Sequence, residues 1–112
     1  MTIVPDLDFA RIHKYCAERV PAQFLDRIRI EATVRGRSVT IFECRPPWRE
    51  DVGPEWTRHP VAQMRYDVAN NLWTLYWSDH NQRWHIYDFI DSGTISELLE
   101  EIELDRTAIF WG

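Results

Sequence analysis

The chain has 112 residues, of which 45% are hydrophobic and 13% aromatic, and its formal net charge is -5. This composition is typical of a globular domain and excludes a disordered chain. The acidic total argues against nucleic-acid binding, which needs a basic surface. No apolar run approaches the ~20 residues that cross a membrane, and residues 1–6 lack the basic and apolar parts of a signal peptide. We therefore expect one cytoplasmic domain spanning residues 1–112, with no membrane segment.

The charges are unevenly distributed along the chain. Residues 27–65 hold eight arginines against five acids, whereas residues 66–105 hold nine acids against Arg83 alone. Arginine suits bidentate pairing with carboxylates and stacking on aromatic rings better than lysine does. Two regions of opposite sign most simply face each other within one fold or across a dimer.

Residues 5–20 are predicted to form the first helix. Its apolar residues recur at helical spacing, Asp6 or Asp8 can cap its start, and Pro21 ends it because proline pushes the preceding residue out of the helical region. The helical apolar positions are Phe9, Ile12 and Cys16.

Two strands follow. Residues 27–35 alternate between apolar and polar side chains, as expected for a strand buried on one face. A tight turn at Arg35-Gly36, where glycine supplies a positive φ, returns the chain through Val39 and Ile41. The alternation breaks at residues 42–44, which suggests either a bulge or a strand covered on both faces.

Residues 45–60 form a long connection rich in proline. Such a segment is either functional or packed over the sheet. Trp48 and Trp56 are expected to fold back as a lid on the core, with contact to a partner or a ligand as the alternative. Residues 61–68 are the third strand. A two-residue turn at Asn70-Asn71 would then pair Arg65 with Tyr76.

Residues 72–87 carry the strongest strand signal, two aromatic-rich runs around a polar turn. Trp73, Leu75 and Trp77 share a core face. A loop of two or four residues would place Trp84 and Ile86 beside them, because even loop lengths preserve which way the side chains point. The other face would then carry Thr74, Tyr76, Ser78, Arg83, His85 and Tyr87.

The second helix begins near Thr94, which with Glu97 fits a capping box. An apolar stripe at helical spacing predicts its buried side, and the glutamates at 97, 100, 101 and 103 its solvated side. Residues 108–111 are expected to form a short strand or a docked tail. The stripe consists of Ile95, Leu98, Leu99 and Ile102.

These elements predict an α+β fold. We expect a two-layer sandwich, with a mainly antiparallel sheet of about five strands and one helix at each end of the chain.

Several motifs resemble those of a known family. They are Phe42-Glu43-Cys44-Arg45-Pro46-Pro47-Trp48, Pro60-Val61-Ala62, Trp73 with Tyr76-Trp77, Arg83-Trp84-His85 with Tyr87, and Phe110-Trp111-Gly112. In this order they resemble a family of small bacterial proteins, domain of unknown function 3024, over nearly the whole chain. The resemblance implies a soluble single-domain protein without assigned activity or catalytic positions. Small proteins of this kind also occur in mobile gene-cassette arrays.

The outward positions of the strands predict a chemically rich sheet face. It has three interpretations: a solvated face with cross-strand pairs, a protein–protein surface, or a small-molecule pocket beneath the 45–60 loop, in a binding protein or an enzyme. The candidate ligand-binding or interface residues, which include one tryptophan of the loop, are Arg29, Glu31, Trp48, Arg65, Tyr76, His85 and Tyr87.

Catalysis has weaker support. His85 could act as a general base oriented by Glu43, but no nucleophile is placed by spacing, so we predict no catalytic residue. His80, His85 and Asp79 lack a recognised metal-ligand spacing. Cys16 and Cys44 form no CxxC pair and are expected to be reduced, packed thiols. We therefore expect no metal and no cofactor.

The leading hypothesis is a non-enzymatic interaction module that self-associates. A homodimer is favoured, and a different protein partner is the other possibility. The alternative function is small-molecule binding or catalysis in the pocket on the polar sheet face.

Overall fold

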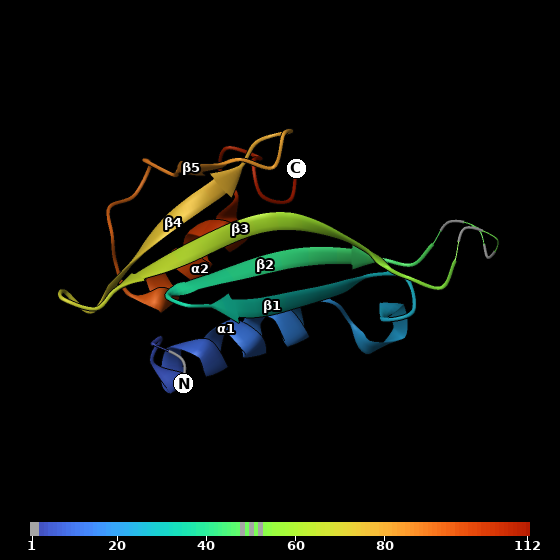
Figure 1. Ribbon diagram of the computed structural model, residues 1–112, viewed down its shortest axis with the longest axis horizontal. Coiled ribbons are helices and arrows are strands. Elements are labelled where there is room, and N and C mark those ends of the chain that lie inside the picture. Colours follow the sequence, from blue (N-terminus) through green and yellow to red (C-terminus); the bar gives the residue numbers. More distant parts are fainter. Residues whose placement is uncertain (1–2, 48, 50, 52) are drawn as a thin grey trace.

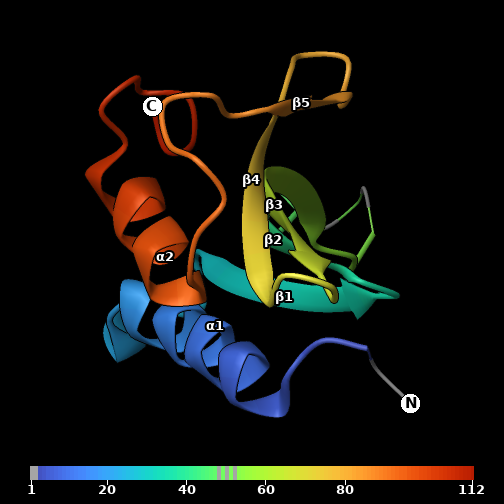
Figure 2. The same cartoon turned by 90° about the vertical axis from the view of Figure 1, so that its left-hand side faces the viewer.

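The computed structural model describes residues 3–47, 49, 51 and 53–112. It contains two helices and one open, five-stranded antiparallel sheet in the order β1-β2-β3-β4-β5, which confirms the predicted α+β fold. Both helices lie on one side of the sheet and leave the other face without a helix (Figures 1 and 2). Neither helix is long and apolar enough to cross a membrane in the part of the chain described. The elements are α1 (Asp6–Arg19), a 3-10 turn η1 (Ala22–Phe24), β1 (Arg29–Arg35), β2 (Ser38–Arg45), β3 (Thr57–Asp67), β4 (Leu72–Ser78), β5 (Trp84–Ile86) and α2 (Ile95–Leu104).

Helix α1 follows the predicted bounds but not the predicted cap. Its start at Pro5 has no side-chain cap. The Asp8 carboxylate instead accepts a hydrogen bond of 2.9 Å from the buried Trp73 Nε1. Ile12 and Cys16 are buried against the sheet. The helix therefore uses an acid of its first turn to satisfy a donor of the sheet.

The β1–β2 hairpin and the bulge agree with expectation. Arg35 pairs with Ser38, and Gly36 has a φ of 61°. The register between β2 and β3 shifts at Ile41/Phe42. Strand β3 begins at Thr57, so it is longer than predicted, and the connection shortens to residues 46–56.

The predicted two-residue turn between β3 and β4 is wrong. Asp67 pairs with Leu72, so four residues separate the strands and Arg65 pairs with Thr74. The Asp67 carboxylate explains the longer turn, because it accepts hydrogen bonds from the Ala69 amide and from Asn70 Nδ2. The shift is two residues, so every side chain keeps its predicted face.

The predicted loop between β4 and β5 is also wrong, with larger consequences. Ser78 pairs with Trp84, which leaves a loop of odd length, residues 79–83. An odd loop reverses the direction of every following side chain. Ile86 pairs with Tyr76 on the uncovered face and is 58% exposed, whereas Tyr87 is buried beneath the helices. The structure therefore reverses the prediction for this strand. Trp84 and Ile86 point to the side without helices, and His85 and Tyr87 point to the helix side.

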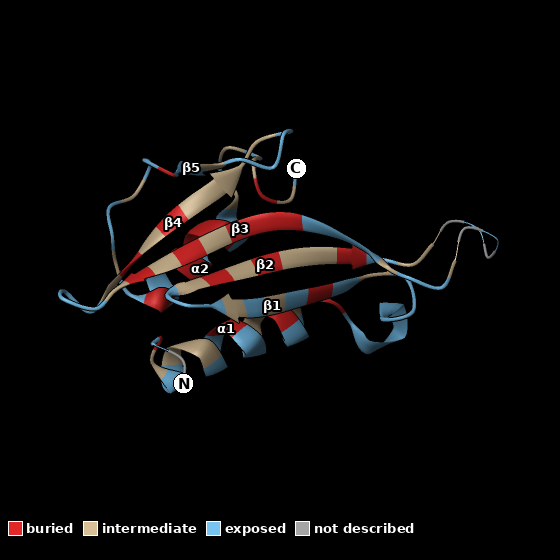
Figure 3. Ribbon diagram, viewed as in Figure 1, coloured by how far each residue is buried: buried red, intermediate tan, exposed pale blue. Residues whose placement is uncertain are grey.

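The core lies between the sheet and the helices. Buried bands recur along β2, β3 and β4 where their inward residues meet α1 and α2 (Figure 3). The predicted capping box at Thr94 and Glu97 is present, and the apolar stripe of α2 is buried. Residues 108–111 form no strand. They dock as a tail, with Phe110 buried in the core.

Removing the cap of α2 tests its contribution. Thr94→Ala deletes the side-chain acceptor of the Glu97 amide and should lower the free energy of unfolding by about 1 kcal/mol. Urea unfolding monitored by tryptophan fluorescence measures the change. Ser96→Ala, an exposed position in the same first turn, should change the stability much less. Equal losses in both variants would contradict a specific capping role.

Candidate functional site

The structure brings four of the predicted site residues together on one face of the sheet. Register and alternation place Arg29, Glu31, Arg65 and Tyr76 on the side without helices. We call this surface the uncovered face. Trp48 lies outside the described residues. The members of the uncovered face include Arg29, Glu31, Thr33, Arg35, Ser38, Thr40, Phe42, Cys44, Arg58, Pro60, Gln63, Arg65, Thr74, Tyr76, Ser78, Trp84 and Ile86.

Arg65 is held at the centre of this face by its neighbours. Its Nε donates to Gln63 Oε1 at 2.8 Å, and Gln63 in turn donates to Thr40 Oγ1 at 2.9 Å. Its guanidinium carbon lies 3.8 Å from the centroid of the Tyr76 ring. In the part of the chain described, the terminal nitrogens of Arg65 make no hydrogen bond. The side chain is therefore oriented and keeps its two terminal nitrogens, with their four N–H groups, for another group.

Two further arginines stack on aromatic rings. Arg29 lies 4.1 Å from the Trp56 ring centroid, and Arg58 lies 4.2 Å from that of Phe42. Such contacts contribute about 0.5–1 kcal/mol each at exposed sites. Trp56 thus contacts an arginine of β1 rather than covering the core as predicted. The uncovered face is a row of arginine–aromatic pairs.

A small hollow lies beside Arg65. Its volume is about 210 Å³, below the ~300–1,000 Å³ of most small-ligand pockets. It lies near the turns at residues 36–37 and 68–71, whereas the segment around Trp56 extends from the opposite end of the sheet (Figure 1). This hollow therefore does not lie beneath the 45–60 loop, and the pocket expected there stays a prediction. The lining includes Arg37, Ser38, Arg65, Asp67, Thr74 and Tyr76.

His85 lies apart from this group. It pairs across the strands with Trp77 and stacks on its ring at 4.7 Å. Its Nε2 lies 2.7 Å from Asp79 Oδ2. The His85 hydrogen bond, supported by the backbone amide of Arg83, lowers the pKa of Asp79 to about 2. Asp79, not the predicted Glu43, is the carboxylate that orients His85.

Asp79 also shapes the loop. Its Oδ1 accepts hydrogen bonds from the Asn81 amide at 2.8 Å and from the Arg83 amide at 3.0 Å. These bonds close the five-residue loop, so the carboxylate has a structural role. Among the residues described, no group of three His, Cys, Asp or Glu side chains could hold a metal ion.

Tyr87 is a core residue. It is 2% exposed, and its hydroxyl donates to Glu101 Oε1 at 2.9 Å. Arg106 Nη2 donates to the other carboxylate oxygen at 3.0 Å and lowers the pKa of Glu101. Glu101 is 5% exposed, so its predicted place on the solvated side of α2 is wrong. The polar contacts that satisfy it come from Tyr87 and from the C-terminal segment.

The two cysteines are free and buried. Burial raises the pKa of Cys16 to about 12. Burial and the nearby Glu31 carboxylate, which accepts from Cys44 Sγ at 3.6 Å, raise the pKa of Cys44. Neither group is a ready thiolate at neutral pH.

A family model, described as Domain of unknown function (DUF3024), matches residues 2–112. The chain belongs to this family. No curated protein matches the chain, and no solved structure matches it. The geometry described above is therefore the basis for assigning a role to this DUF3024 domain.

Sequence reasoning missed three residues of the arginine–aromatic stacks, namely Arg58, Phe42 and Trp56. Arg58 and Phe42 come from strands whose pairing depends on the bulge, and Trp56 comes from the long connection. The Asp79 contacts had a visible signal, because aspartate at the start of a turn commonly accepts hydrogen bonds from amides two residues on.

The buried carboxylate of the DUF3024 domain should make its stability depend on pH. The pKa of Glu101 is lower in the folded state, so its contribution is present above the ordinary glutamate pKa and is lost as the pH falls. Glu101→Gln should cost about 1.5–3 kcal/mol at neutral pH, because hydrogen bonds to the charged group are lost. The difference from the unmodified protein should shrink below about pH 4.

Urea unfolding at neutral and acidic pH measures this difference. Glu100→Gln is the matched control, because Glu100 is an exposed neighbour on the same helix. A Glu101→Gln penalty that stays constant with pH would show that the loss has another origin.

Proposed function

We propose that this domain is a non-enzymatic protein-interaction module that binds an acidic protein surface on its uncovered face. The observation that carries the proposal is the geometry of Arg65. Gln63 and Tyr76 fix its guanidinium, and its outer nitrogens remain available to a carboxylate. Arginine and carboxylate form a bidentate pair, and a donor that is already oriented loses less entropy on binding.

The composition of the face supports a protein as the partner. Arginine, tyrosine and tryptophan are enriched at interfaces and supply most of the residues whose truncation costs binding energy. The row of stacked pairs extends from Arg29 to Tyr76 across four strands. A surface of this breadth fits a protein better than a small molecule.

Self-association remains part of the proposal. The uncovered face carries more arginine than acid, so two copies placed face to face would repel each other. Helix α2 lies on the opposite side of the sheet from this face (Figure 2), and it carries exposed glutamates such as Glu100. A head-to-tail contact between the face of one copy and α2 of the next therefore has complementary charges.

Light scattering over micromolar concentrations tests this proposal. Arg65→Ala should weaken self-association by about 2 kcal/mol, roughly thirtyfold in the dissociation constant. Glu100→Lys should have a similar effect, and added salt should weaken association of the unmodified protein. Arg11→Ala removes an exposed arginine of α1 and should change nothing. A strict monomer at every concentration would rule out self-association.

A second candidate is binding of a small anion, because Arg37 and Arg65 both line the 210 Å³ hollow. A thermal-shift screen with small carboxylates and inorganic phosphate tests it. Binding to the native state raises stability by about 2.7 kcal/mol at a hundredfold excess over the dissociation constant. The shift should disappear in Arg65→Ala and persist in Arg11→Ala. If none of these anions raises the melting temperature, this candidate fails.

A further inference from the structure

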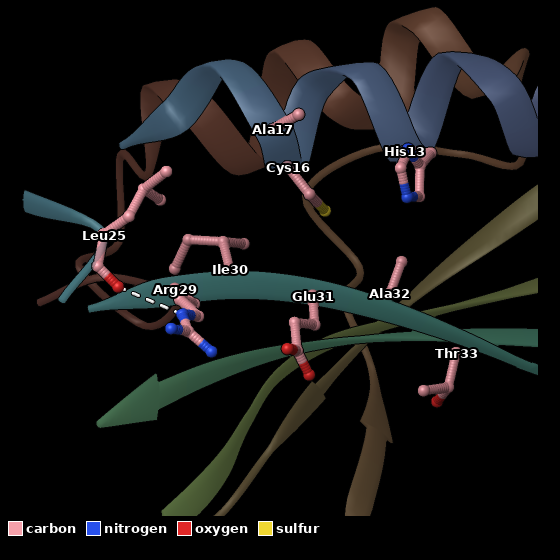
Figure 4. Close-up of a pocket in the computed structure, with 9 residues that line it drawn as sticks. All are labelled: His13, Cys16, Ala17, Leu25, Arg29, Ile30, Glu31, Ala32 and Thr33. Atoms are coloured by element: carbon pink, nitrogen blue, oxygen red, sulfur yellow. Dashed lines mark hydrogen bonds between the residues drawn. The ribbon is translucent and has the colours of Figure 1, made fainter. Parts of the chain in front are cut away.

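A groove runs between α1 and the free edge of the sheet. Strand β1 pairs with β2 on one side and has no strand on its other side in the part of the chain described. The groove has a volume of about 440 Å³ and is lined by His13, Cys16 and Ala17 of α1, by Leu25, and by residues 29–33 of β1. Figure 4 shows His13 and Cys16 directed from the helix toward the strand. Leu25 is 41% exposed.

In the part of the chain that the structure describes, alternate backbone groups of β1 face this groove and have no strand to bond to. A two-residue hairpin places its flanking residues, Arg35 and Ser38, in a hydrogen-bonded pair, and such pairs alternate along the strand. Arg29, Glu31, Thr33 and Arg35 therefore direct their N–H and C=O groups to β2. The intervening Ile30, Ala32 and Val34 direct theirs to the free edge, where an added strand could bond to them.

We propose that this groove binds an extended peptide segment of a partner protein as an additional strand beside β1. Its alternate side chains would contact Cys16, Ala17 and Leu25, which requires apolar residues at every second position. The hydrogen bonds to the β1 edge would supply sequence-independent affinity, and the apolar contacts with α1 would select the sequence. This site shares Arg29, Glu31 and Thr33 with the uncovered face but not Arg65, and it does not depend on the function proposed for that face.

The charges around the groove define the peptide further. Residues 27–37 contain four arginines and one glutamate. Arg27 and Arg29 lie at one end of β1, Arg35 and Arg37 lie at the other, and Glu31 lies between them. A complementary peptide has acidic residues near both ends and a neutral or basic residue at its centre.

A second copy of the chain fits this edge less well. Antiparallel pairing of β1 with itself about Ala32 would place Arg29 against Arg35, and like charges directly opposite are destabilising. Pairing about Ile30 would match Arg29 with Glu31, but it would extend onto residues 25–27. Those residues form a turn, and Arg29 Nε donates to Leu25 O at 3.0 Å across it. The free edge of β1 therefore favours a segment of a different protein over a second copy of this chain.

Selection from a phage-displayed library of random linear peptides tests the proposal. We expect enrichment of peptides with alternating apolar residues and acidic ends. A selected peptide, synthesised with a fluorescent label, should shift the backbone amide resonances of Ile30, Ala32 and Val34. Methylation of the peptide nitrogens that face β1 should remove binding, because it removes the donors of the added strand.

Two tryptophan variants locate the site. Ala17→Trp fills the groove from an exposed helix position and should weaken peptide binding by at least about tenfold, equivalent to 1.4 kcal/mol. Arg11→Trp places the same side chain at an exposed position on the opposite face of the same helix, outside the groove lining, and should leave the affinity unchanged.

Three outcomes would overturn the proposal: no enrichment of the expected pattern, binding that survives Ala17→Trp, or a change of oligomeric state in Ala17→Trp, which would assign the edge to a second copy. Arg65→Ala should not alter peptide binding, so failure here and failure at the uncovered face are distinguishable.

Discussion

The burial of one sheet face beneath two helices is the constraint on which the rest of this fold depends. Successive side chains of a strand point to opposite faces, so a slip of one residue would expose the entire core. Ile41, Met64, Trp73 and Leu75 are each at most 1% exposed. Each fully buried side chain of this kind contributes about 1.5–3 kcal/mol or more, which makes the inward set of β2, β3 and β4 very hard to reverse. The hydrogen bond from Trp73 to Asp8 joins α1 to that same face.

The burial of one sheet face does not determine the lengths of the turns and loops. Local hydrogen bonds to aspartate side chains determine them. Asp67, Asp79 and Asp105 each accept from backbone amides at the end of an element. At Asp67 the result is a turn of even length, which changes the partners but not the faces. At Asp79 the result is a loop of odd length, so β5 presents Ile86 outward and brings Tyr87 inward. One carboxylate therefore determines which aromatic residues are available at the surface.

The sequence predicted the parts of the fold that depend on periodicity. The bounds of α1, the inward residues of β1 to β4, the bulge near Phe42 and the capping box of α2 all agree with the structure. The same periodicity placed Arg65 and Tyr76 on one face correctly. It could not give the length of the 79–83 loop, because the choice between even and odd depends on bonds made by one side chain in three dimensions. His85 and Tyr87 were misplaced for that reason. Glu101 was misplaced because the residues that pair with it are Tyr87, which directly follows β5, and Arg106 of the C-terminal segment.

The stacked arginines cover the aromatic rings of the sheet face that no helix covers. Without the arginines, the rings of Phe42, Trp56 and Tyr76 would each expose apolar surface, which promotes non-specific association. An arginine laid over each ring covers apolar surface with its own stem and guanidinium while it keeps a charge in water. The face is thereby protected without being closed. Because each stack orients its guanidinium in the free domain, the contacts that cover the rings are also the contacts on which the proposed binding of a carboxylate depends.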